Sequence, residues 1–375
     1  MNHIAMLVPT IDEIGGAESQ VLLLSEELSR RGWRVSVVAL SGSGGTASAR
    51  LAAAGIDYYS SRMRCGWFDP QGWTRYLGWA ASNQPDVVHS HLPHATWFAR
   101  WVRLLSPVRV VVDTIHTSNT GTLGRRVGYR LSSWLSNRVT CVSETVANAA
   151  TSAKMVRPEK LMVLPNGVPL QPSRPARRCE GHSPFLWVAV GRLAPVKDYP
   201  TLLRAFATLR DNPRLLIAGA GPEEMALRDL AANLGIEDRV EFTGYRQDIQ
   251  PLLVTADAFV LSSLWEGLPV SVLEAQAAGL PVVATDAAGT REAMLEGQSG
   301  LLVPVGDSGA LSSALNQIMA TPNETRCRMG DTGRQFIQER FSLPAVADRW
   351  EALYRELLKS NPSAARWAKP SRSPV

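Results

Sequence analysis

The sequence predicts an α/β protein built from two doubly wound parallel-sheet domains. Short apolar runs of strand length alternate with segments whose apolar residues recur at helical spacing. This alternation is typical of parallel sheets covered by helices on both faces. With 375 residues the chain is long enough for two domains of ordinary size. We therefore expect one sheet in each half of the chain.

One unit of the second half shows the alternation most clearly. Residues 257–261 and 281–285 have the composition of short buried strands. Between them, apolar residues recur at helical spacing until Gly279, which is expected to end the helix. Pro269 is expected at the first helical position, where its missing N–H costs nothing. The unit thus reads as strand, loop, helix and strand.

Two glutamates flank the start of this helix. Glu266 falls on the loop that enters it, and Glu274 falls inside it. Open parallel sheets bind ligands at the carboxyl ends of their strands. The free amides of a helix N-terminus suit a phosphate, and carboxylates suit hydroxyl groups that donate to them. The pattern indicates a nucleotide or sugar-diphosphate ligand; the alternative is an ordinary crossover helix with a solvated Glu266.

The first half begins with a strand, a glycine-containing loop and a helix expected over residues 17–30. Gly15 and Gly16 lie in this loop, and adjacent glycines allow a phosphate to approach the backbone. The loop lacks the Gly-x-Gly-x-x-Gly pattern, so we expect no nicotinamide cofactor. The strands expected in this half are residues 4–8, 34–40, 86–91, 108–115 and 138–144, the last with its turn.

Histidines gather near the ends of two of these strands. His89, His91 and His94 are spaced by two and then three residues. This spacing matches neither one helix face nor a known zinc motif, and no Cys or carboxylate completes a ligand set. We therefore expect no metal there. His116 directly follows the strand at 108–115, a position from which a side chain is expected to point into the ligand crevice.

Two basic residues follow the first strand of the second half. Arg192 and Lys197 lie five residues apart, on a loop that opens a helix. A guanidinium and an ammonium that converge near a helix start suit a diphosphate. Further elements expected in this half are strands at residues 185–190, 214–218 and 239–243 and an amphipathic helix at residues 341–358.

Charge and tryptophan are concentrated in the first half. Residues 1–170 hold 17 Lys and Arg against 11 Asp and Glu, and seven of the 11 Trp residues. Arg125, Arg126 and Arg130 lie with Leu131 and Trp134 on a basic amphipathic helix expected near residues 124–137. Such a helix suits an anionic membrane surface. The alternative is an ordinary surface helix, with the tryptophans in the core. No nucleic-acid module is recognised.

Other composition features bear on the compartment. No run of eighteen apolar residues is present, and the N-terminus has no basic start and no small-residue cleavage site. Four widely separated cysteines form neither a metal pattern nor a disulfide framework, which fits a reducing cytosol. We expect a cytoplasmic protein, either free or peripheral at the inner face of the membrane.

The sequence motifs around the two glutamates resemble a known family signature. Glu266-Gly-Leu-Pro and Glu274-Ala, seven residues apart and followed by Gly-Leu-Pro-Val-Val-Ala-Thr, closely resemble the signature of glycosyltransferase family 4. That family consists of retaining, metal-independent sugar transferases of the GT-B fold. The resemblance implies two Rossmann-like domains facing a cleft, with a C-terminal helix that crosses back to the first domain. It also implies that no cofactor and no metal is needed.

The resemblance implies roles for individual residues. In the first domain, Gly15 and Gly16 would face the donor diphosphate, Glu18 and His91 the acceptor, and His116 the donor sugar. In the second domain, Arg192 and Lys197 would hold the donor diphosphate, Glu266 the sugar hydroxyls and Glu274 the ribose hydroxyls. The turn at Gly267 and Leu268 would add amides, and Tyr245 and Arg246 would line the nucleobase. The family usually has Gly where this chain has Asp198.

We expect an acceptor-binding domain at residues 1–170, a linker at 171–184 and a donor-binding domain at 185–340. The returning helix is expected at 341–360 and a disordered tail at 361–375. The predicted function is transfer of a sugar from a UDP- or GDP-sugar to a glycan or lipid-linked acceptor, as in bacterial surface-polysaccharide, lipopolysaccharide or glycolipid assembly. Two alternatives stay open: a non-hydrolysing UDP-sugar 2-epimerase-like isomerase, and a non-catalytic sugar-nucleotide binding module.

Overall fold

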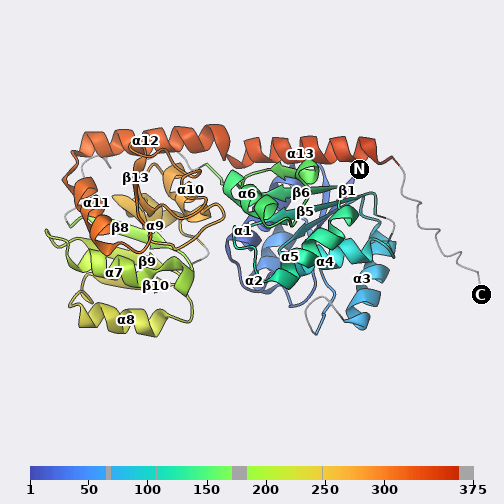
Figure 1. The fold of residues 1–375 in the computed structure, drawn as a ribbon, viewed down its shortest axis with the longest axis horizontal. Helices are drawn as coiled ribbons and strands as arrows, with labels where there is room; N and C mark the ends of the chain where they lie inside the picture. Colours follow the sequence, from blue (N-terminus) through green and yellow to red (C-terminus); the bar gives the residue numbers. More distant parts are fainter. Residues whose placement is uncertain (65–68, 107, 171–183, 247, 363–375) are drawn as a thin grey trace, which may run out of the picture. The chain divides into compact units, whose positions relative to one another are not determined.

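The computed structural model describes residues 1–64, 69–106, 108–170, 184–246 and 248–362. The chain divides into two compact units (Figure 1), one comprising residues 1–167 and 346 onward, the other residues 168–345. The predicted linker at 171–184 and tail at 361–375 lie almost entirely outside the described residues.

The first unit is built on a seven-stranded sheet, order β3-β2-β1-β4-β5-β6-β7, in which every described pairing is parallel. The order reverses between the adjacent strands β1 and β4, so this sheet has a topological switch point there. The strands are β1 (His3–Val8), β2 (Arg34–Ala39), β3 (Asp57–Ser60), β4 (Val87–His91), β5 (Val110–Ile115), β6 (Arg138–Cys141) and β7 (Leu161–Val163).

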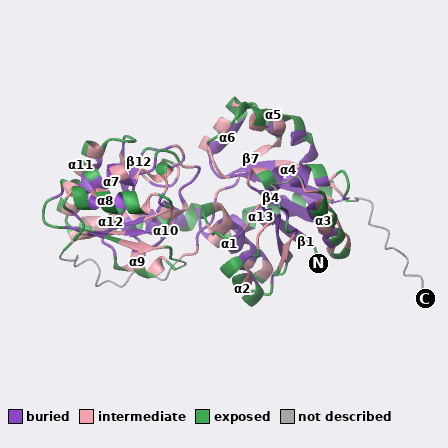
Figure 2. Ribbon diagram, turned by 90° about the horizontal axis from the view of Figure 1, so that it is seen from below, coloured by how far each residue is buried: buried purple, intermediate pink, exposed green. Residues whose placement is uncertain are grey.

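Helices cover both faces of this sheet, and the strands between them are buried (Figure 2). α13 (Leu343–Ser360) adds its apolar face to one core layer, where Trp350, Leu353 and Tyr354 pack with residues of β1 and α1. The predicted returning helix therefore does pack on the first unit from Val346 onward. The other helices are α1 (Gly16–Arg30), α2 (Gly45–Ala53), α3 (Pro70–Asn83), α4 (Pro93–Val102), α5 (Leu123–Ser132) and α6 (Glu144–Ser152), with a 3-10 turn at Ser133–Leu135 after α5.

A buried ion pair joins α4, β5 and α5. Arg100 and Asp113 are fully buried and 2.8 Å apart. The Arg100 guanidinium also donates to the Tyr129 carbonyl and to the Ser132 hydroxyl on α5, each at 3.0 Å. Ser90 of β4 donates to the other Asp113 oxygen at 2.6 Å. Because every partner is a polar group inside the protein, this network fixes α5 against the end of β5.

The second unit is built on a six-stranded sheet, order β10-β9-β8-β11-β12-β13, again parallel in every described pairing. Its order reverses between β8 and β11. The strands are β8 (Leu186–Val190), β9 (Arg214–Ala218), β10 (Val240–Gly244), β11 (Ala258–Leu261), β12 (Val282–Thr285) and β13 (Gly300–Val303). The helices are α7 (Tyr199–Ala207), α8 (Glu224–Asn233), α9 (Gln250–Thr255), α10 (Val270–Ala277), α11 (Ser308–Ala320) and α12 (Asn323–Arg340).

The fold class predicted from the sequence, two Rossmann-like parallel-sheet domains, is confirmed. Pro269 is the N-cap of α10 and not its first helical residue. Cys327 on α12 is disulfide-bonded, which differs from the expectation that the cysteines form no disulfides, whereas Cys141 is a free buried thiol. Of the helices in the described ranges, none has the length and apolar character needed to cross a bilayer.

The Arg100–Asp113 pair leads to a stability prediction. Arg100→Met leaves the Asp113 carboxylate buried without its cation, which costs about 3–5 kcal/mol of unfolding free energy. The matched control is Arg157→Met, because Arg157 forms a solvent-exposed pair with Glu159 and such pairs contribute about 0–1 kcal/mol. Denaturant unfolding followed by tryptophan fluorescence measures both variants. Equal stability of the two variants would contradict a structural role for the buried pair.

Candidate functional site in two parts

The carboxyl ends of β8 and β11 bring together residues that are far apart in sequence. Gly191 and Arg192 follow β8, and the segment from Ser262 to Gly267 follows β11. Connections leave these adjacent strands toward opposite sides of the sheet, which opens a crevice at their carboxyl ends. The predicted donor residues of the second unit converge on this edge.

Lys197 and Glu266 are in direct contact at this edge. The Lys197 ammonium donates to the Glu266 carboxylate at 2.5 Å, and both side chains are mostly shielded from solvent. The Ser263 hydroxyl donates to the same carboxylate oxygen at 2.6 Å, and the Ser262 hydroxyl donates to the Lys197 carbonyl at 2.8 Å. The sequence predicted both charges as ligand contacts but did not predict that they pair with each other.

Glycines allow the loops at this edge to approach one another closely. Gly289 has φ +80°, and a Cβ there would lie 2.1 Å from the Gly267 carbonyl oxygen. A Cβ on Gly221 would lie 2.2 Å from the Leu193 carbonyl oxygen. Only glycine fits contacts this short, so these two positions fix the turn after Glu266 and the loop after Arg192.

Asp198, the departure from the family pattern, lies in the left-handed region with φ 46°. Glycine is the usual residue in this conformation, whereas Asp tolerates it because its side chain can hydrogen-bond locally. Here the Asp198 carboxylate caps α7 by accepting from the Thr201 N–H. The backbone beside Lys197 is therefore held in the conformation that a glycine would favour.

Glu274 lies in the middle of α10 and is largely shielded by the surrounding protein. Burial raises the pKa of its carboxyl group to about 7. No hydrogen bond or ion pair of its side chain is found within the described ranges. A carboxyl group that is desolvated and unpaired can accept from ligand hydroxyls without first breaking an internal contact.

The remaining predicted donor residues lie at the same edge of this sheet. Arg192 is exposed at the end of β8, and Leu268 is buried in the turn before α10. Tyr245 and Arg246 are exposed after β10, the outermost strand. The structure thus brings Lys197 and Glu266 together beside the switch point, places Glu274 on the helix α10 that follows, and leaves Tyr245 and Arg246 beside the outermost strand.

In the first unit, Gly15 and Gly16 begin α1 after β1, at the switch point of that sheet. Gly15 is the N-cap of the helix, and its N–H donates to the Glu18 carboxylate at 3.2 Å. Both glycines are exposed. Glu18, predicted on the acceptor side, therefore also caps the helix from its third position.

Three histidine rings form a column at the ends of β4 and β5. The ring centroids of His89 and His91 are 4.0 Å apart, and those of His91 and His116 are 5.3 Å apart. A 3.0 Å hydrogen bond joins His91 Nδ1 to His116 Nε2. His89 lies at the inner end, bonded to the hydroxyls of Tyr354 and Thr114 at 2.7 Å each.

Burial keeps this column neutral. It lowers the pKa of His89 to about 3 and that of His116 to about 4, and the pKa of His91 is also lowered. His89 is thus a buried core residue whose two ring nitrogens are both bonded within the protein. In the described ranges, no group of three or more His, Cys, Asp and Glu is arranged to hold a metal ion. His91 and His116, predicted to face the ligand, contact each other at the strand ends.

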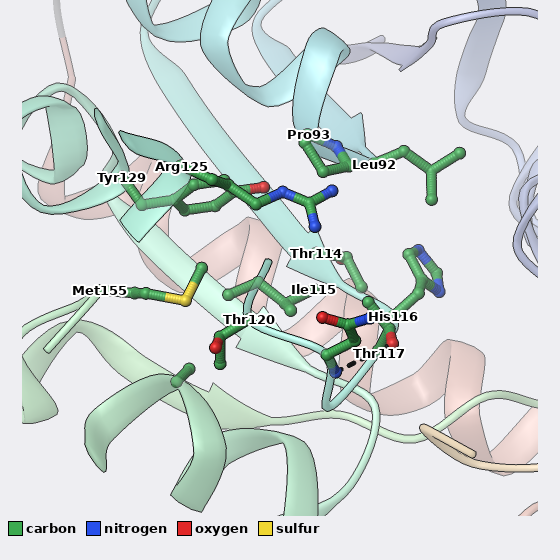
Figure 3. A pocket seen from close by; sticks show the side chains of 12 residues that line it. Leu92, Pro93, Thr114, Ile115, His116, Thr117, Thr120, Arg125, Tyr129 and Met155 are labelled. Atoms are coloured by element: carbon green, nitrogen blue, oxygen red, sulfur yellow. Dashed lines mark hydrogen bonds between the residues drawn. The ribbon is translucent and has the colours of Figure 1, made fainter. Parts of the chain in front are cut away.

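A pocket opens beside His116 (Figure 3). Its lining comes from the start of α4, the end of β5 and the loop that follows, α5, and the segment from Ala150 on α6 to Met155. Arg125 of α5 extends over it (Figure 3). The sequence placed Arg125 on a membrane-docking face and did not predict this pocket, because the turn that directs its side chain depends on the three-dimensional path of residues 117–122.

Two family models match the chain, one in each half. Glycosyltransferase Family 4 matches residues 14–172, and Glycosyl transferases group 1 matches residues 177–336. The lipopolysaccharide core biosynthesis glycosyltransferase LpsE of Rhizobium meliloti is 37% identical over 175 residues, which is 47% of this chain and 50% of that protein.

A second relative matches along almost the whole chain. Phosphatidyl-myo-inositol mannosyltransferase of Mycobacterium leprae is 31% identical over 96% of this chain and 98% of its own length. The crystal structure of Anabaena HepE in complex with UDP has the same fold, with a TM-score of 0.80, 20% identity and coverage of 95% of this chain and all of HepE. The chain therefore belongs to glycosyltransferase family 4.

Proposed function

We propose that this protein is a retaining glycosyltransferase that moves a sugar from a UDP- or GDP-sugar to a glycan or lipid-linked acceptor. The acceptor would belong to surface-polysaccharide, lipopolysaccharide or glycolipid assembly. The observation that carries the proposal is the contact of Lys197 with Glu266 at the β8/β11 switch point. The names of the relatives, one acting in lipopolysaccharide core biosynthesis and one on a phosphatidylinositol, support the acceptor class, and the UDP complex of HepE supports the donor class.

In the proposed reaction the bond from the anomeric carbon to the diphosphate breaks, and a bond from that carbon to the acceptor oxygen forms. The acceptor proton leaves on the departing diphosphate. Negative charge grows on the diphosphate as the sugar becomes oxocarbenium-like, so cations aimed at it lower the barrier. Arg192 and Lys197 supply these cations, and the amides near Gly16 and Gly267 add to them.

The carboxylates and the histidine hold neutral groups. Glu266 accepts from donor-sugar hydroxyls and also orients the Lys197 ammonium that it contacts. Glu274 accepts from the ribose hydroxyls. Because its pKa is lowered to about 4, His116 is neutral at pH 7 and hydrogen-bonds the sugar without delivering a proton. No metal or other cofactor is assigned a role, because Arg192 and Lys197 already supply positive charge to the diphosphate.

We also propose that α5 docks on an anionic lipid surface. Leu131 and Trp134 are 67% and 63% exposed, and Leu123 and Val127 extend the same apolar face into solvent. Figure 2 shows α5 largely in the colour of exposed residues. Inward it presents Tyr129 and Ser132. An amphipathic helix with its apolar face outward and Arg130 beside it has the character of an interfacial helix.

Lys197→Ala tests the proposed chemistry. Loss of one charge-assisted contact to a developing anion should lower turnover by on the order of 10²-fold or more. Transfer from a panel of UDP- and GDP-sugars is measured with the fold checked by circular dichroism. Arg204→Ala, on a helix of the same unit, is the matched control. Unchanged turnover in Lys197→Ala would contradict the assignment, and conversion of a UDP-sugar without any acceptor would favour an epimerase.

Glu274 predicts a pH dependence of donor binding. With a folded-state pKa of about 7, the carboxyl group loses its proton between pH 6 and pH 8, and the carboxylate is the better acceptor for ribose hydroxyls. UDP affinity should rise up to about tenfold over this range. Glu274→Gln should lose that part of the rise, while titration of UDP itself affects both proteins equally. Identical pH profiles by calorimetry would contradict the ribose assignment.

The raised pKa of Glu274 also makes the free energy of unfolding depend on pH. The folded state binds the Glu274 proton more tightly than the unfolded state, so this residue lowers unfolding free energy as pH rises from about 4.5 to 7. Glu274→Gln should remove this contribution, which gives a readout that does not depend on ligand.

Vesicle sedimentation tests the docking of α5. Binding to vesicles of phosphatidylcholine with phosphatidylglycerol should exceed binding to phosphatidylcholine alone and should weaken with salt. Each basic residue near an anionic surface contributes about 1 kcal/mol, so Arg126→Glu/Arg130→Glu should reduce binding more than tenfold. Leu131→Ser/Trp134→Ser should also reduce it, whereas the control Met225→Ser, exposed on α8, should not. Equal binding to both vesicle types would contradict the proposal.

A further inference from the structure

The pocket beside His116 has a polar side and an apolar side, all within the first unit. Thr117, Asn119 and Arg125 contribute polar groups, and Ile115, Tyr129 and Met155 contribute apolar surface. Figure 3 shows the labelled side chains of this lining arranged around one opening, with the Arg125 guanidinium directed over it from α5. A ligand that fits this lining has a polar head and an apolar body.

Glycine at position 121 gives the Arg125 side chain its place. Gly121 has φ +71°, and a Cβ there would lie 2.6 Å from Arg125 Cδ and 2.7 Å from Arg125 Nη1. The guanidinium therefore lies against the backbone of the loop, in space that any other residue would fill. The arginine is oriented by the fold toward the pocket and not left free in solvent.

The pocket lining and the first turn of α5 contain basic side chains and no acidic ones. The pocket lining contains no Asp or Glu, and the first turn of α5 has no acidic residue although Arg125 and Arg126 occupy it. A helix N-terminus carries partial positive charge, so arginines there destabilise the helix unless an anion balances them. No hydrogen bond or ion pair of the Arg125 guanidinium is found within the described ranges.

The loop that forms one wall is already ordered. The Asn119 N–H donates to the Thr117 hydroxyl at 3.1 Å, and the Gly121 N–H donates to the Asn119 side-chain oxygen at 2.9 Å. Thr122 then caps α5 by accepting from the Arg125 N–H. Beside this loop, Nδ1 of His116 is buried without a hydrogen-bond partner. The site is thus preorganised for a ligand that reaches His116.

We propose that this pocket binds an oxyanion carried by the acceptor, with Arg125 as its main contact and the apolar wall against the part of the acceptor next to that anion. Identification of the ligand as the acceptor rests on the proposed glycosyltransferase function; the anion site itself does not. Arg125 thereby determines which acceptors bind: those with a phosphate or carboxylate close to the hydroxyl that receives the sugar.

Glycerol 3-phosphate serves as the probe, added to the full chain and followed by NMR titration of histidine and methionine signals. The wild type should bind it, and Arg125→Gln should bind at least about tenfold more weakly, because a contact to a charged group contributes about 1.5–3 kcal/mol. Arg130→Gln is the matched control: it removes the same charge from the same helix at an exposed position outside the pocket. Equal weakening in both variants, or no binding to the wild type, overturns the proposal.

Two further binding experiments identify which kind of acceptor carries the anion and test whether this site is distinct from the donor site. If dihexanoyl phosphatidate binds more tightly than glycerol 3-phosphate, the anion belongs to a lipid headgroup. If glucuronate binds more tightly than glycerol 3-phosphate, the anion belongs to an acidic glycan. UDP affinity should be unchanged in Arg125→Gln and reduced in Lys197→Ala. If the wild type does not bind UDP, the proposed transferase function is rejected but the anion site is not. If Arg125→Gln does not bind UDP, the anion site is not separate from the donor site, and the proposal is wrong.

Discussion

The parallel arrangement of each sheet is the constraint on which the rest of the structure depends. When all strands run the same way, their carboxyl ends lie on one edge, so the loops that follow adjacent strands lie beside one another, and a crevice opens where the strand order reverses. In the second unit this brings Lys197 into contact with Glu266, although 69 residues separate them. In the first unit the same rule brings His91 and His116 together from β4 and β5.

Desolvation at these edges sets the protonation states with which the protein meets its ligands. The histidine column is neutral, and the Glu274 carboxyl titrates near neutral pH. The Lys197 ammonium is paired with the Glu266 carboxylate. A donor that brings a diphosphate and hydroxyl groups would complete these contacts. The column also links the first unit's site to its C-terminal helix, because Tyr354 of α13 bonds His89.

Much of the fold could be predicted because buried parallel strands are continuous apolar runs. The predicted first and last residues of β9 match those of the structure, and those of β8, β11 and β12 match to within one residue. β3, with the sequence Asp57-Tyr-Tyr-Ser, was not assigned, because as an edge strand it is only half-buried and lacks the apolar signal. α12 was not assigned either, since its 18 residues are mostly polar and few of them are buried.

For the candidate site, the sequence predicted which loops carry the functional residues but not which of these residues contact one another. Glu266 and Lys197 follow strand ends, which the sequence reveals, but their pairing depends on the adjacency of β8 and β11. The fold also shows which of the large apolar side chains are exposed, which the sequence did not predict: Leu131 and Trp134 face solvent, whereas Trp79 and Trp350 are buried in the core. The role of Arg125 depends on the left-handed backbone at Gly121, which no residue pattern predicted.

A crystal structure of the protein grown with UDP would test whether the β8/β11 edge binds the nucleotide-sugar donor. We expect the diphosphate beside Arg192 and Lys197, with the ribose hydroxyls within hydrogen-bond distance of Glu274. Density for UDP at any other place, with Lys197 still paired to Glu266 and Glu274 without a ligand contact, would show that this edge is not the donor site.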